Sequence, residues 1–180
     1  MRIISGKYKG KRIQAPKNLP VRPTTDFAKE ALFNILNNLT NIENAAALDL
    51  FCGTGNITYE LLSRGANPIT CVDIHFKNLQ FVRKTISELK ETSNVIVIRN
   101  DVFKFINTTK QTFDIIFADP PYDLTKINDI PLLIFKNQLL NPNGYLIVEH
   151  GKNTDLSKIS NFMEQRKYGN VNFSIFSNKN

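Results

Sequence analysis

The sequence is poor in the residues that mark disulfide-rich, metal-binding and membrane-spanning proteins. Cys52 and Cys71 are the two cysteines, and each lies in or beside an apolar run, so buried reduced thiols are expected. With His75 and His150 they have no zinc-site spacing, and no metal is expected; the histidines are expected to be structural or surface residues. No apolar run approaches the roughly 20 residues that cross a bilayer, and the N-terminus has no apolar core of a secretion signal. We therefore expect a cytoplasmic protein with no membrane partner.

Glycine and proline are also scarce. The 180 residues contain 8 of each, and 42% of the chain is apolar, which excludes fibrous and disordered classes. A chain of this length forms a single core. One globular unit is expected, in a protein that acts as a monomer.

Acidic residues are absent from the first 25 positions, which carry seven basic ones. The chain has 23 Lys plus Arg against 16 Asp plus Glu, so the rest has equal numbers of each sign and the net charge of +7 belongs to this segment. A basic end on a neutral body favours a polyanionic partner, although a solvated basic arm is the alternative. The seven are Arg2, Lys7, Lys9, Lys11, Arg12, Lys17 and Arg22.

Short apolar runs alternate with helical patterns from Ala45 onward. The runs are 46–51, 69–74, 95–98, 113–118 and 144–149, and the helical segments are 57–64, 77–91, 102–106 and 130–140. This alternation predicts an α/β, Rossmann-like fold with a mostly parallel sheet covered on both faces. Gly169-Asn170, between two extended runs in 162–176, predicts an antiparallel C-terminal hairpin at the sheet edge.

Two segments precede the alternating runs and helical patterns that begin at Ala45. Residues 1–22 predict a small basic β-hairpin with strands at 2–4 and 12–14, followed by a stiff connector with Pro16, Pro20 and Pro23. Residues 26–39 place apolar side chains on one face of a helix that Thr24 or Thr25 can cap. We therefore divide the chain into an extension, 1–22, and a main domain, 23–180.

A glycine-containing loop follows the first run. Asp49 to Gly55 reads D-L-F-C-G-T-G and leads into a helix, so Gly53 and Gly55 let the backbone approach a nucleotide-type cofactor near Phe51. The third glycine of the dinucleotide pattern would stand at Thr58, so that pattern is incomplete. Asp49 can accept hydrogen bonds from a cationic amine, which S-adenosylmethionine (SAM) has and NAD lacks.

Two more acids end the next runs. Asp73 is placed to accept ribose hydroxyls, and Asp101 to accept from an adenine amino group with Ile74 and Val102 against the ring. Capping of the following helix is the alternative role for each acid.

The fourth run ends in Asp119-Pro120-Pro121-Tyr122. The two prolines fix an extended, rigid turn with outward carbonyls. The Asp119 carboxylate and the Pro120 carbonyl can each accept one N–H of a planar amine, while Tyr122 stacks on the base. Direct methyl displacement then needs alignment and a proton acceptor, either Asp119 or water. No Pro-Cys dipeptide supplies a thiolate for carbon methylation, and no Ser/His/Asp trio suggests hydrolysis.

These motifs resemble those of class I SAM-dependent amino methyltransferases. Two further stretches, 22–34 with R-P-T-T-D and L-F-N, and Tyr168-Gly169-Asn170, together with the opening S-G-K-Y-K-G-K-R-I, resemble the RsmD family of 16S rRNA guanine-N2 methyltransferases along almost the whole chain. The family usually has small residues where Cys52, Asn56 and Thr58 stand, and commonly Asn at Thr85.

The resemblance implies methylation of N2 of one guanine in the 16S rRNA of the small ribosomal subunit. It implies SAM contacts at Asp49, Gly53, Gly55, Asp73 and Asp101, and base recognition by residues 119–122. The basic hairpin would hold rRNA phosphates, and the segment beginning at Arg22 would lie across the cofactor mouth. The expected RNA-binding residues are Lys7, Lys9, Lys11, Arg12, Arg22, Thr24 and Thr25.

Three alternatives stay open. A DNA adenine-N6 methyltransferase fits because the turn accepts any exocyclic amine, although the chain has no room for a separate target-recognition domain. A non-catalytic RNA-binding assembly factor on a SAM-like scaffold would not need the acids and the turn. A nicotinamide dehydrogenase is the weakest, because the third glycine is missing.

Overall fold

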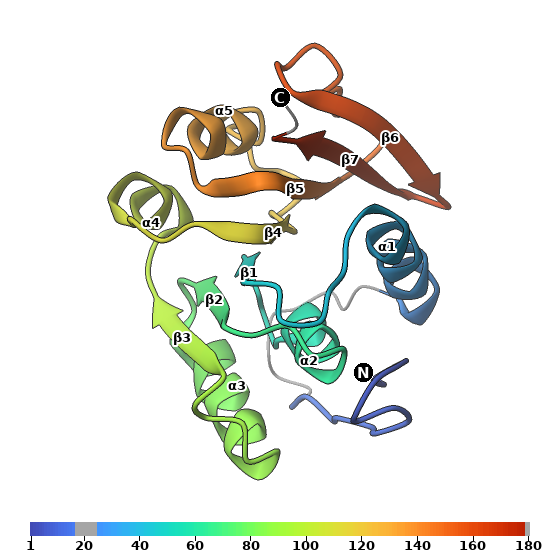
Figure 1. Ribbon diagram of the computed structural model, residues 1–180, viewed down its shortest axis with the longest axis vertical. Helices are drawn as coiled ribbons and strands as arrows, with labels where there is room; N and C mark the ends of the chain where they lie inside the picture. The colour runs from blue at the N-terminus through green and yellow to red at the C-terminus, as the bar shows by residue number, and fades with distance from the viewer. Residues whose placement is uncertain (17–24, 179–180) are drawn as a thin grey trace.

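The computed structural model describes residues 1–16 and 25–178. Within these ranges the chain forms five helices and one seven-stranded sheet (Figure 1). The helices are α1 (Asp26–Leu39), α2 (Asn56–Ser63), α3 (Phe76–Glu88), α4 (Val102–Thr108) and α5 (Asp129–Lys136). The strands are β1 (Ala47–Leu50), β2 (Ile69–Asp73), β3 (Val95–Arg99), β4 (Phe113–Ala118), β5 (Leu140–His150), β6 (Phe162–Tyr168) and β7 (Val171–Ser177).

The sheet has the strand order β3-β2-β1-β4-β5-β7-β6. The first five strands are parallel, and β7 runs antiparallel between β5 and β6. Leu50 of β1 is in register with Val72 of β2 on one side and Ala118 of β4 on the other. The strand order therefore reverses between β1 and β4, and in open α/β sheets ligands bind beyond the carboxyl ends of the strands at such a point.

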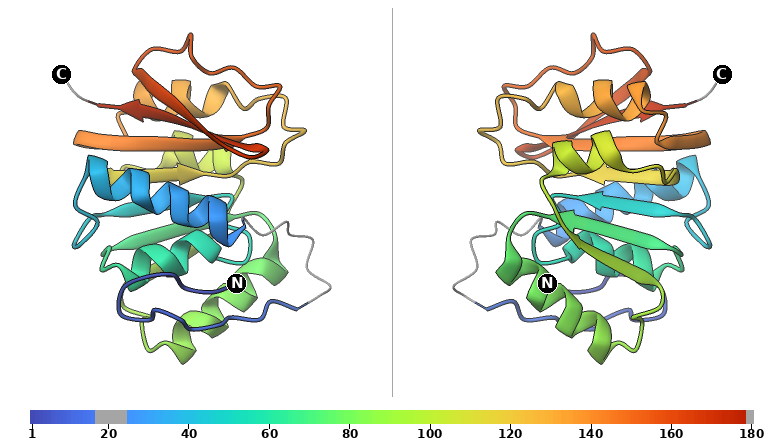
Figure 2. Two further views of the ribbon diagram at one scale, coloured as in Figure 1. Left: turned by 90° about the vertical axis from the view of Figure 1, so that its right-hand side faces the viewer. Right: turned by 90° about the vertical axis from the view of Figure 1, so that its left-hand side faces the viewer.

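Helices cover both faces of the sheet (Figures 1 and 2). One apolar core joins the sheet to α1, α2 and α3, and a second joins it to α4 and α5. The strands β1 and β2 are buried along their whole length, which explains why their sequences are continuous apolar runs rather than alternating patterns. The predicted C-terminal hairpin is confirmed as β6 and β7.

Three element boundaries differ by three residues or more from the sequence-based prediction, and one of them is the start of β5, at Leu140 rather than at 144. Helix α5 ends at Lys136 rather than at Leu140, because Gln138 has a positive φ of 54° and Leu140 already pairs with Phe113 of β4. Helix α3 ends at Glu88 rather than 91, just before Lys90 with a φ of 61°. By contrast, α1 has the predicted bounds, and the Thr25 hydroxyl caps it by accepting from the Ala28 N–H.

The N-terminal segment forms the expected hairpin, with Arg2 opposite Arg12 in an antiparallel bridge. The hairpin is docked along α2 (Figure 2, dark blue). The N–H groups of Ile4 and Ser5 donate to the two carboxylate oxygens of Glu60 at 2.8 and 3.0 Å. The Lys7 N–H donates to the Ser63 carbonyl at 2.7 Å. The extension is thus held by backbone hydrogen bonds to a helix of the main domain.

Candidate active site

A hollow of about 520 Å³ opens at the carboxyl ends of the parallel strands. Every residue predicted for cofactor or base recognition lines it except Gly55, which lies in the loop that shapes it. Thr25 also lines it, whereas the side chains of the basic hairpin do not. The predicted residues at its wall are Thr25, Asp49, Phe51, Gly53, Asp73, Ile74, Asp101, Val102, Asp119, Pro120, Pro121 and Tyr122.

The loop between β1 and α2 owes its shape to left-handed backbone. Phe51, Gly53 and Gly55 have φ values of 60°, 51° and 83°. A Cβ on Gly55 would lie 2.8 Å from Cζ of the buried Tyr59 ring, so this position requires glycine for space as well as conformation. The tight turn brings the backbone of Gly53 to the wall of the hollow.

Asp49 lies beneath this loop and is 1% exposed. Its Oδ2 accepts from the Thr58 N–H at 3.0 Å and from the Thr58 hydroxyl at 2.5 Å. Burial raises the pKa of Asp49 to about 7, while the Thr58 hydrogen bonds oppose that shift. Thr58, which replaces the third glycine of the dinucleotide pattern, therefore stabilises the ionised form of the Asp49 carboxylate by two hydrogen bonds. A cationic ligand group beside Asp49 would favour its ionised form.

Asp73 and Asp101 both accept backbone N–H groups. Asp73 accepts from Gly53 at 2.8 Å through Oδ2 and from His75 at 2.7 Å through Oδ1, so it ties the glycine loop to the start of α3. The exposed Asp101 caps α4, accepting from Lys104 at 2.9 Å. One oxygen of Asp101 thus has the helix-capping role that was the alternative to cofactor binding. The recognition of adenine by Asp101 stays a prediction.

The Asp119–Tyr122 turn lines the same hollow as the glycine loop and follows the neighbouring strand β4. The Asp119 N–H donates to the Leu50 carbonyl at 3.3 Å, which fixes the turn to β1. Tyr122 is 43% exposed, and its ring lies over Gly151, where an added Cβ would be 3.6 Å from the ring. The Tyr122 hydroxyl donates to Oε1 of Glu149 at 3.3 Å. The turn therefore presents a carboxylate and an aromatic ring at the same opening.

Glu149 and Asn78 are polar residues of the hollow that the sequence reasoning missed. Glu149 is the last residue of the apolar run predicted at 144–149 and the last but one of β5, so the strand-end rule that selected Asp73 and Asp119 would also have selected it. Asn78 lies in the first turn of α3 and is buried, and its Oδ1 has no hydrogen-bond partner among the described residues. An unsatisfied buried acceptor in the wall of a hollow is a place for a ligand donor.

Sequence reasoning also missed a buried lysine behind the cofactor loop. Lys29 of α1 is 1% exposed. Its ammonium donates to the Arg2 carbonyl at 2.7 Å and to the Asn56 side-chain oxygen at 2.9 Å, and it lies 3.6 Å from the carboxylate of the buried Glu60. Glu60 also pairs with Arg64 at 2.9 Å. Asn56, where the family usually has a small residue, thus links α1 to the N-terminus of α2.

The predicted RNA-binding residues have different surroundings. Lys9, Lys11 and Arg12 are exposed on the hairpin, whereas the Lys7 ammonium pairs with Glu91 at 2.6 Å. Arg22, Thr24 and the connector prolines Pro20 and Pro23 lie outside the described residues. RNA contacts for all of these residues stay predictions.

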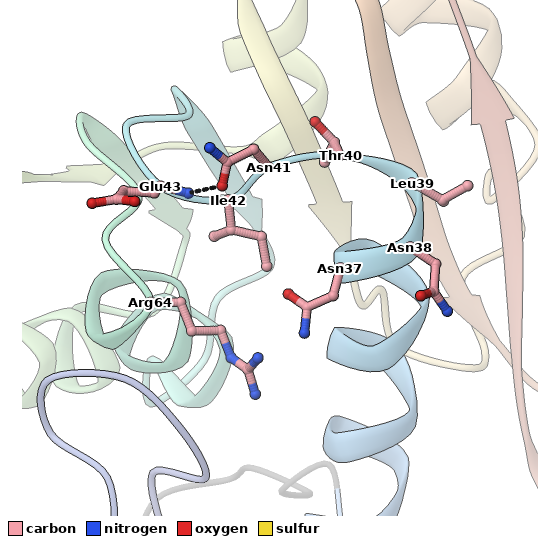
Figure 3. A pocket seen from close by; sticks show the side chains of 8 residues that line it. All are labelled: Asn37, Asn38, Leu39, Thr40, Asn41, Ile42, Glu43 and Arg64. Carbon is pink, nitrogen blue, oxygen red and sulfur yellow. Dashed lines mark hydrogen bonds between the residues drawn. The ribbon is translucent and has the colours of Figure 1, made fainter.

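A second hollow lies at the opposite end of the sheet, between the end of α1 and the end of α2 (Figure 3). Asn37 and Arg64 reach toward it from the two sides. Arg64 is already engaged there by Glu60 and by the Phe33 ring, 4.6 Å from its guanidinium carbon. This hollow holds none of the predicted site residues, so the first hollow is the candidate active site.

Neither a membrane span nor a metal cluster occurs in the part of the chain that the structure describes. No helix among residues 25–178 is long and apolar enough to cross a bilayer. No group of three or more His, Cys, Asp or Glu side chains in the described ranges is placed to hold a metal ion. Cys52 and Cys71 are buried free thiols, as predicted.

Comparison with known proteins shows the family of the chain. The family described as "Conserved hypothetical protein 95" matches residues 1–177. "Ribosomal RNA small subunit methyltransferase D" of Buchnera aphidicola subsp. Baizongia pistaciae is 34% identical over 100% of this chain and 93% of that protein. "Putative rRNA methyltransferase YlbH" of Bacillus subtilis is 33% identical over 99% of this chain and 100% of that protein.

The fold has equally close counterparts among solved structures. The structure of "Putative methyltransferase yhhF from Escherichia coli" superposes with a TM-score of 0.87 at 26% identity, covering 100% of this chain and 98% of that one. The predicted Rossmann-like class I methyltransferase fold is confirmed. The match along residues 1–177 and the identities above show that the chain belongs to the family described as Conserved hypothetical protein 95, the RsmD family that the sequence motifs resemble.

Proposed function

We propose that this protein transfers the methyl group of SAM to the exocyclic N2 of a guanine in 16S rRNA. The observation that carries the proposal is that the Asp119–Tyr122 turn and the glycine loop, which follow the neighbouring strands β4 and β1, line the same hollow. Two relatives, one named a ribosomal RNA small subunit methyltransferase and the other a putative rRNA methyltransferase, support rRNA as the substrate. The guanine N2 position comes from the resemblance of the motifs.

The cofactor is SAM, and the residues of the hollow fit it. Asp49 is a buried carboxylate whose raised pKa falls when an ammonium group binds beside it. Asp73 lies where a ribose is expected, and the unsatisfied Oδ1 of Asn78 offers a further acceptor. Ile74 and Val102 flank the expected adenine position. When bound, SAM supplies a methyl group activated by its sulfonium.

The chain's own contribution to the reaction is to orient the amine and accept its proton. The Asp119 carboxylate and the Pro120 carbonyl accept the two N–H bonds of the amine, and Tyr122 stacks on the base. Hydrogen bonds aimed out of the amino plane draw the nitrogen toward tetrahedral geometry and concentrate its lone pair. Asp119, or a water beside it, takes the proton. Alignment of this kind accounts for a large part of the barrier reduction in displacement reactions.

The basic hairpin provides the proposed RNA contact. Lys9, Lys11 and Arg12 are exposed on an extension that is hydrogen-bonded to α2, so their charges stand at a fixed place beside the main domain. Phosphate contacts of this kind give affinity without reading sequence. The base is then selected at the hollow.

The test is methyl transfer from labelled SAM to 30S particles by the wild-type protein and by Asp119→Ala. We expect incorporation by the wild type and a loss of about 100-fold or more in the variant, the usual contribution of a positioned acid or base. Thermal stabilisation by SAM should be alike in both proteins, which controls for folding and cofactor binding. Equal incorporation by the two proteins would contradict the role of Asp119.

The product identifies the target amine. Digestion of the methylated RNA to nucleosides should yield N2-methylguanosine, whereas N6-methyladenosine would favour the adenine methyltransferase alternative. Absence of stabilisation by SAM at about 1 mM would favour the non-catalytic assembly factor.

A further inference from the structure

Glu149 stands next to the Asp-Pro-Pro-Tyr turn in space although it is 30 residues away in sequence. Ala118 of β4 is in register with Val148 of β5, so Asp119 and Glu149 leave neighbouring parallel strands side by side. Both line the hollow. Glu149 is 3% exposed, and it is the only acid of the hollow contributed by β5 among the described residues.

The position of Glu149 is fixed from both sides. Its strand pairs with β4 on one side, and on the other side Glu149 itself is in register with Phe173 of β7. The next residue, His150, is buried and hydrogen-bonded to the Ser174 hydroxyl at 2.8 Å. The Tyr122 hydroxyl donates to Oε1 of Glu149 at 3.3 Å. A carboxylate has about four lone-pair positions, so Glu149 can keep this contact and still accept from a ligand.

Guanine carries two kinds of hydrogen-bond donor on nitrogens that are bonded to the same carbon, C2. The N2 amine is the proposed methyl acceptor, and the neighbouring ring nitrogen N1 carries a hydrogen. Adenine differs at this place, because its N1 has a lone pair and no hydrogen. A carboxylate accepts hydrogen bonds and repels lone pairs, so a carboxylate facing N1 favours guanine.

We propose that Glu149 is a specificity-determining residue that accepts the N1–H of guanine while Asp119 and Pro120 accept from N2. This inference rests on the proposed function and adds the reason why guanine is chosen over adenine. A buried site built to accept a particular N–H rejects an analogue that lacks it, because its acceptor is then left without a partner. For a charged acceptor the discrimination is roughly 10- to 150-fold.

The analogue that tests this contact is 2-aminopurine, which lacks both the N1 hydrogen and the O6 of guanine. It keeps the exocyclic amine on C2, but its N1 is an acceptor like that of adenine. The Glu149 variants separate the two differences, because they change only the partner proposed for N1. The experiment uses small-subunit particles reconstituted from ligated 16S rRNA, with guanine or 2-aminopurine at the position that the wild-type protein methylates. Methylated nucleosides are measured by mass spectrometry, and kcat/KM is compared for the two bases.

We expect the wild type to prefer guanine by roughly 10- to 150-fold. Glu149→Gln should lose activity on guanine and narrow the preference to about threefold, because the amide can turn its oxygen or its NH2 group toward N1. An unchanged preference, with equal losses on both bases, would overturn the inference and leave Glu149 a purely structural residue. Comparable melting temperatures and SAM-induced stabilisation would establish that the variant is folded.

Two further variants keep the test decisive. Glu149→Asp retains the charge but withdraws the carboxylate by one methylene, so the preference should also narrow, and this variant serves if Glu149→Gln does not fold. Tyr122→Phe removes the hydroxyl and leaves the carboxylate, so overall activity falls while the preference is kept. A preference that collapses in Tyr122→Phe but persists in both Glu149 variants would overturn the assignment. If the wild type produces no N2-methylguanosine at all, the proposed function fails, and that result is distinct from an unchanged preference.

Discussion

The buried ammonium of Lys29 gives a stability prediction that can be worked from its contacts. Lys29→Met keeps the length and the apolar stem but removes two hydrogen bonds, to Arg2 and Asn56, and the ion pair with Glu60. Glu60 is 0% exposed, so its charge stays buried after the change. Removing one partner of a buried pair costs about 3–5 kcal/mol. Because Arg64 and two backbone N–H groups still hold Glu60, the lower part of that range is expected.

The assay is urea unfolding followed by circular dichroism, with a thermal melt beside it. A loss of about 3 kcal/mol in the free energy of unfolding corresponds to a fall in Tm of roughly 6–12 °C for a chain of this size. The matched control is Lys84→Met, which breaks an exposed pair with Glu88 at 3.9 Å, with side chains 75% and 60% exposed. That variant should lose less than about 0.5 kcal/mol. A loss in Lys29→Met as small as in the control would refute the claim that this network holds α1 and the hairpin to α2.

Three other predictions concern the hollow, the hairpin and the helix cap. The pKa of Asp49, raised from 3.8 to about 7 by burial, means that the folded state favours the protonated form, so its contribution to stability declines as pH rises from about 4 to about 7. SAM, whose ammonium needs the ionised form, should bind roughly tenfold more tightly at pH 8 than at pH 6 by calorimetry, and Asp49→Asn should abolish that dependence. Changing Lys9, Lys11 and Arg12 together to Glu should weaken rRNA binding and reduce its salt slope by roughly 2–3, and an equal fall in SAM affinity would mean that the hairpin is structural. Thr25→Ala should cost about 1 kcal/mol in unfolding experiments by removing the α1 cap, and no measurable change would show that the cap is dispensable.

The fold was predictable because its signals are local. Fully buried parallel strands give continuous apolar runs, and α1 shows its apolar face and its threonine cap within 15 residues, so its bounds were predicted without error. The ends of α3 and α5 were predicted less well. They depend on single residues with positive φ, Lys90 and Gln138, which the apolar pattern does not show.

The site was predictable in position and less so in detail. Strand ends place Asp49, Asp73 and Asp119 at one edge, since parallel strands share that edge. The local sequence pattern does not show which side chains become buried or which residues distant in sequence pair with them. A lysine within a helical pattern, such as Lys29, would be assigned to the surface. Its burial could not be predicted, because the carboxylate that pairs with it, Glu60, is 31 residues away in sequence. Asn78 resembles any polar residue of a first helical turn until its burial is seen.

The close contact between Gly6 of the hairpin and helix α2 bears on how the protein would select its RNA target. A Cβ at this position would lie 1.8 Å from the Ser63 carbonyl oxygen, and its φ of 80° is left-handed, so the hairpin lies directly against the backbone of α2. The same helix begins at the cofactor loop and carries Thr58 against Asp49. One helix of eight residues, from Asn56 to Ser63, would thus set the distance between an RNA segment bound at the hairpin and the hollow. The choice of target would then depend on the distance between the phosphate bound at the hairpin and the guanine bound in the hollow. An RNA in which that distance is too short or too long would not be methylated.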